Sequence, residues 1–279
     1  MVSAVTSHAI DWYGPCDASG MKWKLLSAVL LSVAFSGLGC AVDTDEDGIS
    51  STSGDDVGED PTREGEEEVS ADELKLGDAR SDGFEEPTYS ASEKASVLAQ
   101  YDHVDPDGEV PRTLLENALQ YFHKNRAKIE NQGWLTIIDM GQHSGKKRFF
   151  LIGMDSGTVT PTVVAHGSGS DPDHDGLATR FSDTNDSHRT SIGYYLTAET
   201  YSGQHGFSLK LDGLSKTNKS ARARAIVMHG ASYVAKGNAK QGRSWGCPAV
   251  PNNEKDGLIQ KLRGGSLLYI DTTAGAESR

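Results

Sequence analysis

The sequence predicts a mainly β domain with a few helices, arranged as a β-sandwich or barrel, from residue 101 onward. One observation is a series of short apolar or alternating runs separated by turn residues, which is typical of strands. Another is that only two segments of this part show the apolar spacing of a helix. This order of elements favours a mostly antiparallel sheet or barrel with the helices outside it.

The first expected element is a helix that begins at Val110 and Pro111. Apolar residues such as Leu115 and Leu119 form one stripe along it, and it ends near residues 131–133. A second, short helix is expected at residues 254–262. Strands are expected at residues 134–139, 148–154, 159–165, 192–197, 208–211, 225–228 and 267–271, with a tight turn at 212–213.

An acidic segment precedes this domain. The chain has 279 residues and a net charge of −13, which argues against a nucleic-acid-binding protein. Residues 41–100 alone hold 19 Asp and Glu against 4 Lys and Arg. Because they contain few aromatic residues, they bury too little apolar surface to offset the entropy lost on ordering. We therefore expect residues 41–100 to be a disordered tether and residues 101–279 to be the folded domain.

Residues 21–40 have the features of a signal peptide. A basic start at Lys22 and Lys24 precedes an apolar run at residues 25–35, which is too short to span a bilayer of about 30 Å. Residues 1–20 are expected to be an extension that comes from an upstream start codon.

Cys40 ends the stretch LGC, which resembles a bacterial lipobox, in which the cysteine becomes the lipidated first residue of the mature protein. The alternative is ordinary cleavage of the signal peptide near Cys40. The acidic spacer favours lipidation, because an anchored enzyme needs a flexible tether to reach its substrate. We expect the protein to be exported to the periplasm of a Gram-negative bacterium and anchored to a membrane through Cys40.

Cys247 is the one cysteine of the folded domain. Removal of the signal peptide would take away Cys16, and lipidation would use Cys40, so Cys247 would stand alone in an oxidising compartment. Such a thiol is either a small buried side chain or a nucleophile. His229 follows a strongly apolar strand 18 residues earlier, and its imidazole is suited to accept the thiol proton.

The residues before Cys247 suit a loop that presents a nucleophile. Gly246 permits a close turn that points backbone N–H groups toward a developing oxyanion, and Ser244 can form an orienting hydrogen bond within the loop. Each feature alone is better explained as an ordinary turn, and His229 alone as a satisfied core histidine. Their occurrence together with a lone exported thiol favours catalysis.

These residues resemble a known family. His229 and Gly230, followed by SWGC at residues 244–247, are similar to the HG and SxGC signature of the L,D-transpeptidase (YkuD-type) domain. The chain resembles in particular the murein L,D-transpeptidase catalytic domain (YkuD_2-like) branch between Tyr101 and Thr272. The further matching stretches are VAHGSGS (164–170), RFS (180–182), SIGYYLT (191–197), GQHG (203–206) and GRSWGCPA (242–249).

The resemblance implies a YkuD-like β-sandwich or barrel in which Cys247 attacks a peptidoglycan stem peptide and His229 is the base. It implies a thioester intermediate and an oxyanion site made by the N–H of Cys247 with that of Gly246 or Trp245. It also implies that a backbone carbonyl orients the imidazole, and Gly230 is the nearest one.

We assign substrate binding to Arg243, Tyr233, His166 and His205. The chain departs from the main branch of the family at one position, because Ala249 stands two residues after the cysteine, where that branch has an arginine. The donor that the site prefers is therefore not predicted.

Other functions stay open at this point. Water could accept the acyl group, which would give an L,D-carboxypeptidase or endopeptidase, or the domain could be a non-catalytic peptidoglycan-binding lipoprotein. A metal site is less favoured, because the spacings are irregular and no HExxH motif occurs. The histidines considered as ligands are His166, His174, His188, His205 and His229. We expect no cofactor or metal; the expected partners are peptidoglycan stem peptides and the membrane, and not nucleic acid.

Overall fold

The computed structural model describes residues 70–273. The expected extension (1–20), the signal peptide with its lipobox-like end (21–40) and the first part of the expected tether (41–69) lie outside the described residues. None of the helices in the described part is long and apolar enough to cross a membrane.

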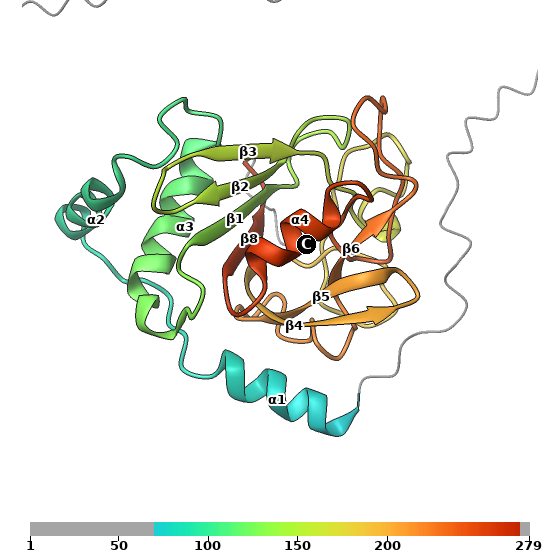
Figure 1. Ribbon diagram of the computed structural model, residues 1–279, viewed down its shortest axis with the longest axis horizontal. Helices are drawn as coiled ribbons and strands as arrows, with labels where there is room; N and C mark the ends of the chain where they lie inside the picture. Colours follow the sequence, from blue (N-terminus) through green and yellow to red (C-terminus); the bar gives the residue numbers. More distant parts are fainter. Residues whose placement is uncertain (1–69, 274–279) are drawn as a thin grey trace, which may run out of the picture. The chain divides into compact units, whose positions relative to one another are not determined.

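The expected mainly β fold is confirmed, and residues 70–273 form four α-helices beside one sheet (Figure 1). The helices are α1 (Ala71–Ser81), α2 (Ala91–Leu98), α3 (Arg112–Lys124) and α4 (Lys255–Leu262), and the short 3-10 turns are Ala99–Tyr101, Arg126–Lys128 and Ser168–Ser170. The strands are β1 (Trp134–Asp139), β2 (Phe149–Gly153), β3 (Val159–Thr162), β4 (Gly193–Gly203), β5 (Gly206–Gly213), β6 (Val227–Ala231), β7 (Ala249–Pro251) and β8 (Leu267–Asp271).

The sheet is mostly antiparallel. Its strand order is β3-β2-β1-β8-β4-β5-β6-β7, and the pairs β1–β8 and β6–β7 are parallel. The chain that follows β3 reaches the opposite edge, where the N–H of Ala165 donates to the carbonyl of Ala249 at 2.9 Å. A bridge between Gly167 and Ser244 continues this contact. The sheet therefore curls toward a closed barrel, and both edges meet near residues 244–249.

Alternate side chains of the central strands enter two separate cores. Leu135 and Ile137 of β1 pack with the apolar stripe of α3, whereas Ile138 packs in the cluster that contains the buried side chains of α4. Strands buried on both faces read as nearly continuous apolar runs, which is why β1, β2 and β8 were predictable. Cys247 belongs to the core on the α4 side.

Some boundaries differ from the expected ones. Helix α3 ends at Lys124 rather than near residues 131–133, because the side chain of Asn125 donates to the carbonyl of Tyr121 and closes the last turn. Residues 212–213 end strand β5 and do not form a turn; the hairpin turn lies at residues 204–205 instead. Strand β7 was not expected, because three residues carry no periodic pattern.

The expectation of a disordered tether is wrong for residues 70–100. Helix α1 begins at a capping box formed by Ser70 and Glu73, and α2 begins at a similar one, so both helices have their first N–H groups satisfied. Val97 of α2 is buried in the cluster around α3. The overall acidic composition concealed these local signals.

Helix α1 is held against the β4–β5 hairpin by ion pairs. The carboxylate of Asp212 is 2.6 Å from Nε of Arg222 and 3.4 Å from Nε of Arg80. Lys210 of β5 pairs with Glu73 of α1. The side chains of Asp212 and Arg222 are only 1% and 6% exposed, and Arg222 has a second carboxylate partner in Glu199 at 2.5 Å. Asp212 and Glu199 together compensate the buried charge of Arg222.

We predict that Asp212→Ala lowers the free energy of unfolding by about 1.5–3 kcal/mol, because it removes the buried carboxylate that Arg222 and Arg80 share, while Glu199 still pairs with Arg222. Denaturant unfolding of the full chain measures this change. Lys75→Ala is the matched control, since it removes an α1 pair with Asp72 whose side chains are 79% and 96% exposed, and about 0.5 kcal/mol or less is expected. Equal losses in the two variants would contradict a special role of Asp212.

Candidate active site

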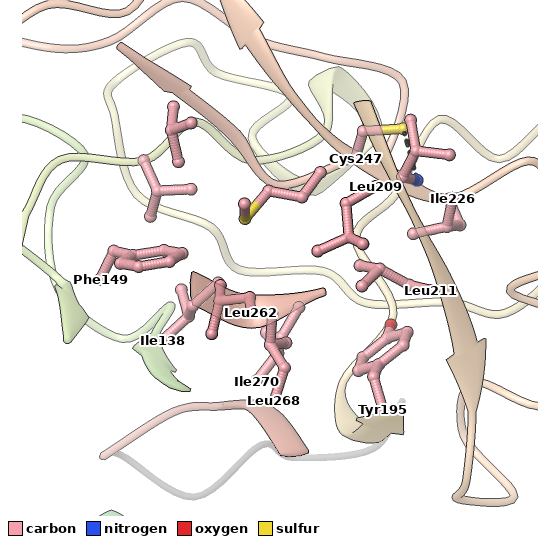
Figure 2. Packing of buried hydrophobic residues seen from close by; sticks show 14 of the residues in the cluster. Ile138, Phe149, Tyr195, Leu209, Leu211, Ile226, Cys247, Leu262, Leu268 and Ile270 are labelled. Atoms are coloured by element: carbon pink, nitrogen blue, oxygen red, sulfur yellow. Dashed lines mark hydrogen bonds between the residues drawn. The ribbon is translucent and has the colours of Figure 1, made fainter. Parts of the chain in front are cut away.

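Cys247 lies two residues before the start of β7, with its side chain at the margin of the core on the α4 side. Figure 2 shows it beside Ile226 and Leu209 at one end of the cluster. The residue is 5% exposed, and its Sγ accepts the backbone N–H of Val227 at 3.4 Å. As a thiol it also reaches the carbonyl of Ala225 at 3.7 Å. A backbone donor aimed at sulfur favours the thiolate, the reactive form of cysteine.

His229 lies in β6 with its side chain buried, and its Nδ1 is 3.0 Å from the carbonyl oxygen of Gly230. A carbonyl only accepts, so Nδ1 carries the hydrogen in this contact and the lone pair of the neutral ring is on Nε2. The parallel register places His229 opposite Ala249, two residues after Cys247. The pairing of β6 with β7 thus brings the base and the thiol to neighbouring strands.

The loop that leads to Cys247, residues 242–247, is the nucleophile loop, and hydrogen bonds of Ser244 close it. The Ser244 hydroxyl donates to the carbonyl of Cys247 at 2.7 Å and accepts the N–H of Gly246 at 3.1 Å. Gly246 has a φ of +122°, and a Cβ there would lie 2.7 Å from the carbonyl of Arg189, so only glycine fits. Because the N–H of Gly246 is engaged with Ser244, it is not suited to the oxyanion role considered for it, which leaves that role to Trp245 and Cys247.

A buried network of charged and polar side chains supports this loop through hydrogen bonds. Arg148, the residue before β2, is fully buried, and its Nη2 donates to Nδ1 of His166 at 2.8 Å. Nε2 of His166 then donates to Asp171 at 3.2 Å. Burial and, to a smaller extent, the charge of Arg148 lower the pKa of His166 to about 4, against the opposing effect of its hydrogen bond to Asp171. His166 is therefore neutral near pH 7, and it is 1% exposed with both ring nitrogens bonded to protein, which does not suit the substrate-binding role expected for it.

Asp171 and Arg243 connect the network to the nucleophile loop. Burial alone would raise the pKa of Asp171, but hydrogen bonds from His166 and from the backbone N–H of Gly176 hold it well below its usual range. Arg243 donates from Nη1 to the backbone carbonyl of Asp171 at 2.7 Å. The N–H of Ser244 donates to the carbonyl of His166 at 2.9 Å. The structure thus places Arg243 in the support of the loop.

The other expected substrate residues lie around the same strands. Tyr233 is 8% exposed and packs against Gly242, where a Cβ would come within 2.6 Å of its side chain. His205 lies at the tip of the β4–β5 hairpin, and its ring stacks on that of His229 at 4.1 Å between centroids. Trp245 stacks on His188 at 4.2 Å.

The sequence analysis missed Arg224, which lies just before β6. Its guanidinium donates to the carbonyls of Ser182 at 3.0 Å and Arg189 at 2.7 Å, and its side chain is 4% exposed. It thereby holds residues 182–191 against Gly246. The stretch RARA before an apolar strand contained this arginine, but no local pattern distinguishes it from a solvated one. Arg148 was likewise expected only as part of a strand. Its side-chain partner, His166, is 18 residues away in the sequence, so no local pattern indicated the contact.

The five histidines considered as metal ligands lie in the described part of the chain and have other surroundings. Within residues 70–273, no three His, Cys, Asp or Glu side chains gather in a way that could hold a metal ion. His166 bonds to Arg148 and Asp171, and the rings of His188 and His205 stack on other aromatic rings.

Comparisons with known proteins agree with the resemblance seen in the sequence. A family model described as "L,D-transpeptidase catalytic domain" matches residues 107–270. A search of curated proteins finds no significant match.

Among solved structures, the chain is similar to the helical cell shape determining protein Pgp2 from Campylobacter jejuni (11% identity, 50% of this chain and 47% of that one, TM-score 0.33). It is similar to an L,D-transpeptidase from Mycobacterium smegmatis (9% identity, 50% and 59%, TM-score 0.33). A third is the L,D-transpeptidase from Stackebrandtia nassauensis (12% identity, 78% and 98%, TM-score 0.32). The chain spans about half of the length of the first two proteins.

We predict that His166 makes the fold sensitive to acid. Its pKa is about 4 in the folded state against an ordinary value of 6.5, so between these values the unfolded chain binds a proton that the native chain does not. Stability therefore falls as the pH falls, by about 3 kcal/mol for this group. Denaturant unfolding at pH 7 and pH 4 should show that wild type loses about 3 kcal/mol more than His166→Asn, which keeps an acceptor for Arg148 but does not titrate. Parallel losses in the two proteins would exclude His166 as the cause.

Proposed function

Because the chain belongs to the L,D-transpeptidase catalytic domain family, we propose that it transfers acyl groups between peptidoglycan stem peptides through a thioester on Cys247. One observation supports the proposal: a buried His229, whose Nδ1–H is bound to Gly230, lies opposite Ala249 in the β6–β7 pairing, two residues after Cys247 in the chain. Nε2 is then the acceptor for the thiol proton. The backbone N–H of Val227 supports the thiolate that results.

In the proposed first step, Nε2 of His229 takes the proton of Cys247 and Sγ attacks the carbonyl carbon before a terminal D-Ala. The negative oxygen of the tetrahedral intermediate is stabilised by backbone N–H groups of Trp245 and Cys247. The C–N bond then breaks, the imidazolium returns its proton to the leaving amine, and the thioester is formed. In the second step, an amine of another stem attacks the thioester and the C–S bond breaks. His229 takes the proton of the amine and gives it to Sγ, which restores the thiol of Cys247.

Recognition of the donor by an arginine after the cysteine does not apply to this chain. Ala249 is fully buried in β7, and Arg243 is bonded to the backbone of Asp171. We propose that the donor is positioned by other residues around the nucleophile loop. Water as the acceptor would make the same site a carboxypeptidase or endopeptidase, and its thioester chemistry would be unchanged.

We also propose that residues 21–40 export the protein and that Cys40 carries a lipid anchor in the periplasm, which rests on the sequence alone. Intact mass of the protein purified from membranes should then exceed the mass of the chain from Cys40 onward by that of acyl and glyceryl groups. Cys40→Ser should abolish this added mass. A membrane-bound Cys40→Ser protein with the same mass addition would contradict the anchor.

For the reaction itself, we predict that Cys247→Ser and His229→Ala each lower turnover of disaccharide-tetrapeptides by about 1,000-fold or more, because nucleophile and base act as one unit. Mass spectrometry of the muropeptide products measures turnover and separates crosslinked dimers from trimmed tripeptides. The matched control is Ser232→Ala, an exposed position after β6, which should retain wild-type turnover.

Each outcome of this experiment has a distinct meaning. Crosslinked products that disappear in both site variants support the transpeptidase. Tripeptides alone, lost in the same variants, identify the hydrolase. Wild-type protein that binds peptidoglycan without any turnover would replace the enzyme with the peptidoglycan-binding lipoprotein.

A further inference from the structure

The tip of the β4–β5 hairpin extends over the strand that carries His229. The last paired residues of the hairpin are Gly203 and Gly206, so Gln204 and His205 form its two-residue loop. Strand β5 in turn pairs with β6, and the partner of Leu209 is Met228, the residue before His229. The hairpin therefore continues past His229, and His205 is the side chain that meets it.

His205 and His229 form a face-to-face contact. Their ring centroids are 4.1 Å apart and their planes differ by 28°. The hydrogen bond from Nδ1 of His229 to Gly230 fixes one atom of the imidazole, whereas a stacked neighbour fixes the plane of the ring. The direction of the Nε2 lone pair depends on that plane, so His205 helps to determine where the base points.

The two histidines differ in their exposure to water. His229 is 2% exposed, whereas His205 is half-buried at the hairpin tip. Because burial disfavours the charged form of an imidazole, His205 is the ring that accepts the first proton of the pair. Two imidazolium rings at stacking distance repel each other, so a proton on His205 opposes a second proton on His229.

The other charged group at the pair is Lys255, the first residue of α4. A Cβ on Gly230 would lie 2.5 Å from Cδ of Lys255, and one on Gly206 would lie 3.0 Å from its Nζ. The side chain thus crosses β6 beside His229 and ends at the hairpin tip. Its neighbour Glu254 is paired with Lys236 at 2.5 Å. The positive charge of Lys255 opposes a proton on either ring, so the order of protonation within the pair follows from the greater exposure of His205 to water.

We propose that His205 is a positioning residue for His229, and that by taking the first proton of the stacked pair it keeps His229 and Cys247 in their reactive forms in mild acid. This inference rests on the proposed function, because it concerns the base of the same thiol. It differs from the substrate-binding role expected from the sequence, since the contact partner of His205 is the base itself.

The test is the rate of alkylation of Cys247 by iodoacetamide in the full chain between pH 4.5 and 9. Peptide mass spectrometry follows Cys247 separately from Cys16 and Cys40. His205→Phe keeps a stacking face but cannot be protonated. We expect the plateau rate, reached at high pH, to equal that of wild type, and we expect the acid limb, where the rate falls with falling pH, to move to higher pH by about one unit. His205→Ala also loses the stack, and we expect the same shift with a plateau about 10-fold lower.

Two controls connect the effect to His229. Ser202→Ala changes an exposed residue of the same hairpin and should reproduce the wild-type profile. In a His229→Ala background, His205→Phe should no longer move the acid limb, because its effect on that limb acts through the base.

The outcomes separate the two hypotheses. An activated thiol in wild type whose profile is the same in both His205 variants overturns the inference and leaves the proposed function standing. If the acid limb shifts but the Phe and Ala variants have equal plateau rates, then loss of the stacked ring has no effect, and His205 is not a positioning residue. A wild-type thiol that reacts only as the pH approaches about 8.5, with no effect of His229→Ala, overturns the proposed function together with the inference.

Discussion

In the parallel pairing of β6 with β7, three consecutive residues of each strand lie opposite one another, and the site depends on this short ladder. It sets His229 beside Ala249, the first residue of the strand that follows Cys247. A ladder of three residues is weak alone, but the chain after β3 bonds to β7 from its other side through Ala165. Strand β7 is therefore held between two neighbours, and the nucleophile loop emerges from a fixed point.

Buried charges hold the loops around this ladder. Arg148, His166 and Asp171 support the nucleophile loop, and Arg224 holds residues 182–191 against Gly246. Apolar side chains could fill these spaces, but they could not satisfy the carbonyls that the loops turn inward, such as the two that Arg224 binds. Breaking one partner of such a network leaves the others buried and unsatisfied. Loop geometry and fold stability are thus coupled at this end of the molecule.

Local signals predicted the parts of the fold that depend on local patterns. Strands β1, β2 and β8 followed from apolar runs, and the choice of Cys247 and His229 as candidate nucleophile and base followed from a lone thiol and a histidine at a strand end. The environment of the site could not be predicted, because Arg148 and Arg224 acquire their roles through partners that are distant in the sequence. Helices α1 and α2 were missed for another reason: capping boxes at Ser70 and Ser90 are visible in the sequence, but an acidic composition outweighed them in the interpretation.

Helix α1 also determines where a mechanical load would enter the domain. Its Glu73 and Arg80 bind side chains that belong to the β4–β5 hairpin, Lys210 and Asp212. A force that pulls on the chain before Ser70 therefore acts on these ion pairs before it acts on the rest of the sheet. The hairpin that receives this force is the one with His205 at its tip. A protein tethered through its N-terminal side would transmit tension to the hairpin that contacts His229, whereas β7, which begins two residues after Cys247, lies outside that path.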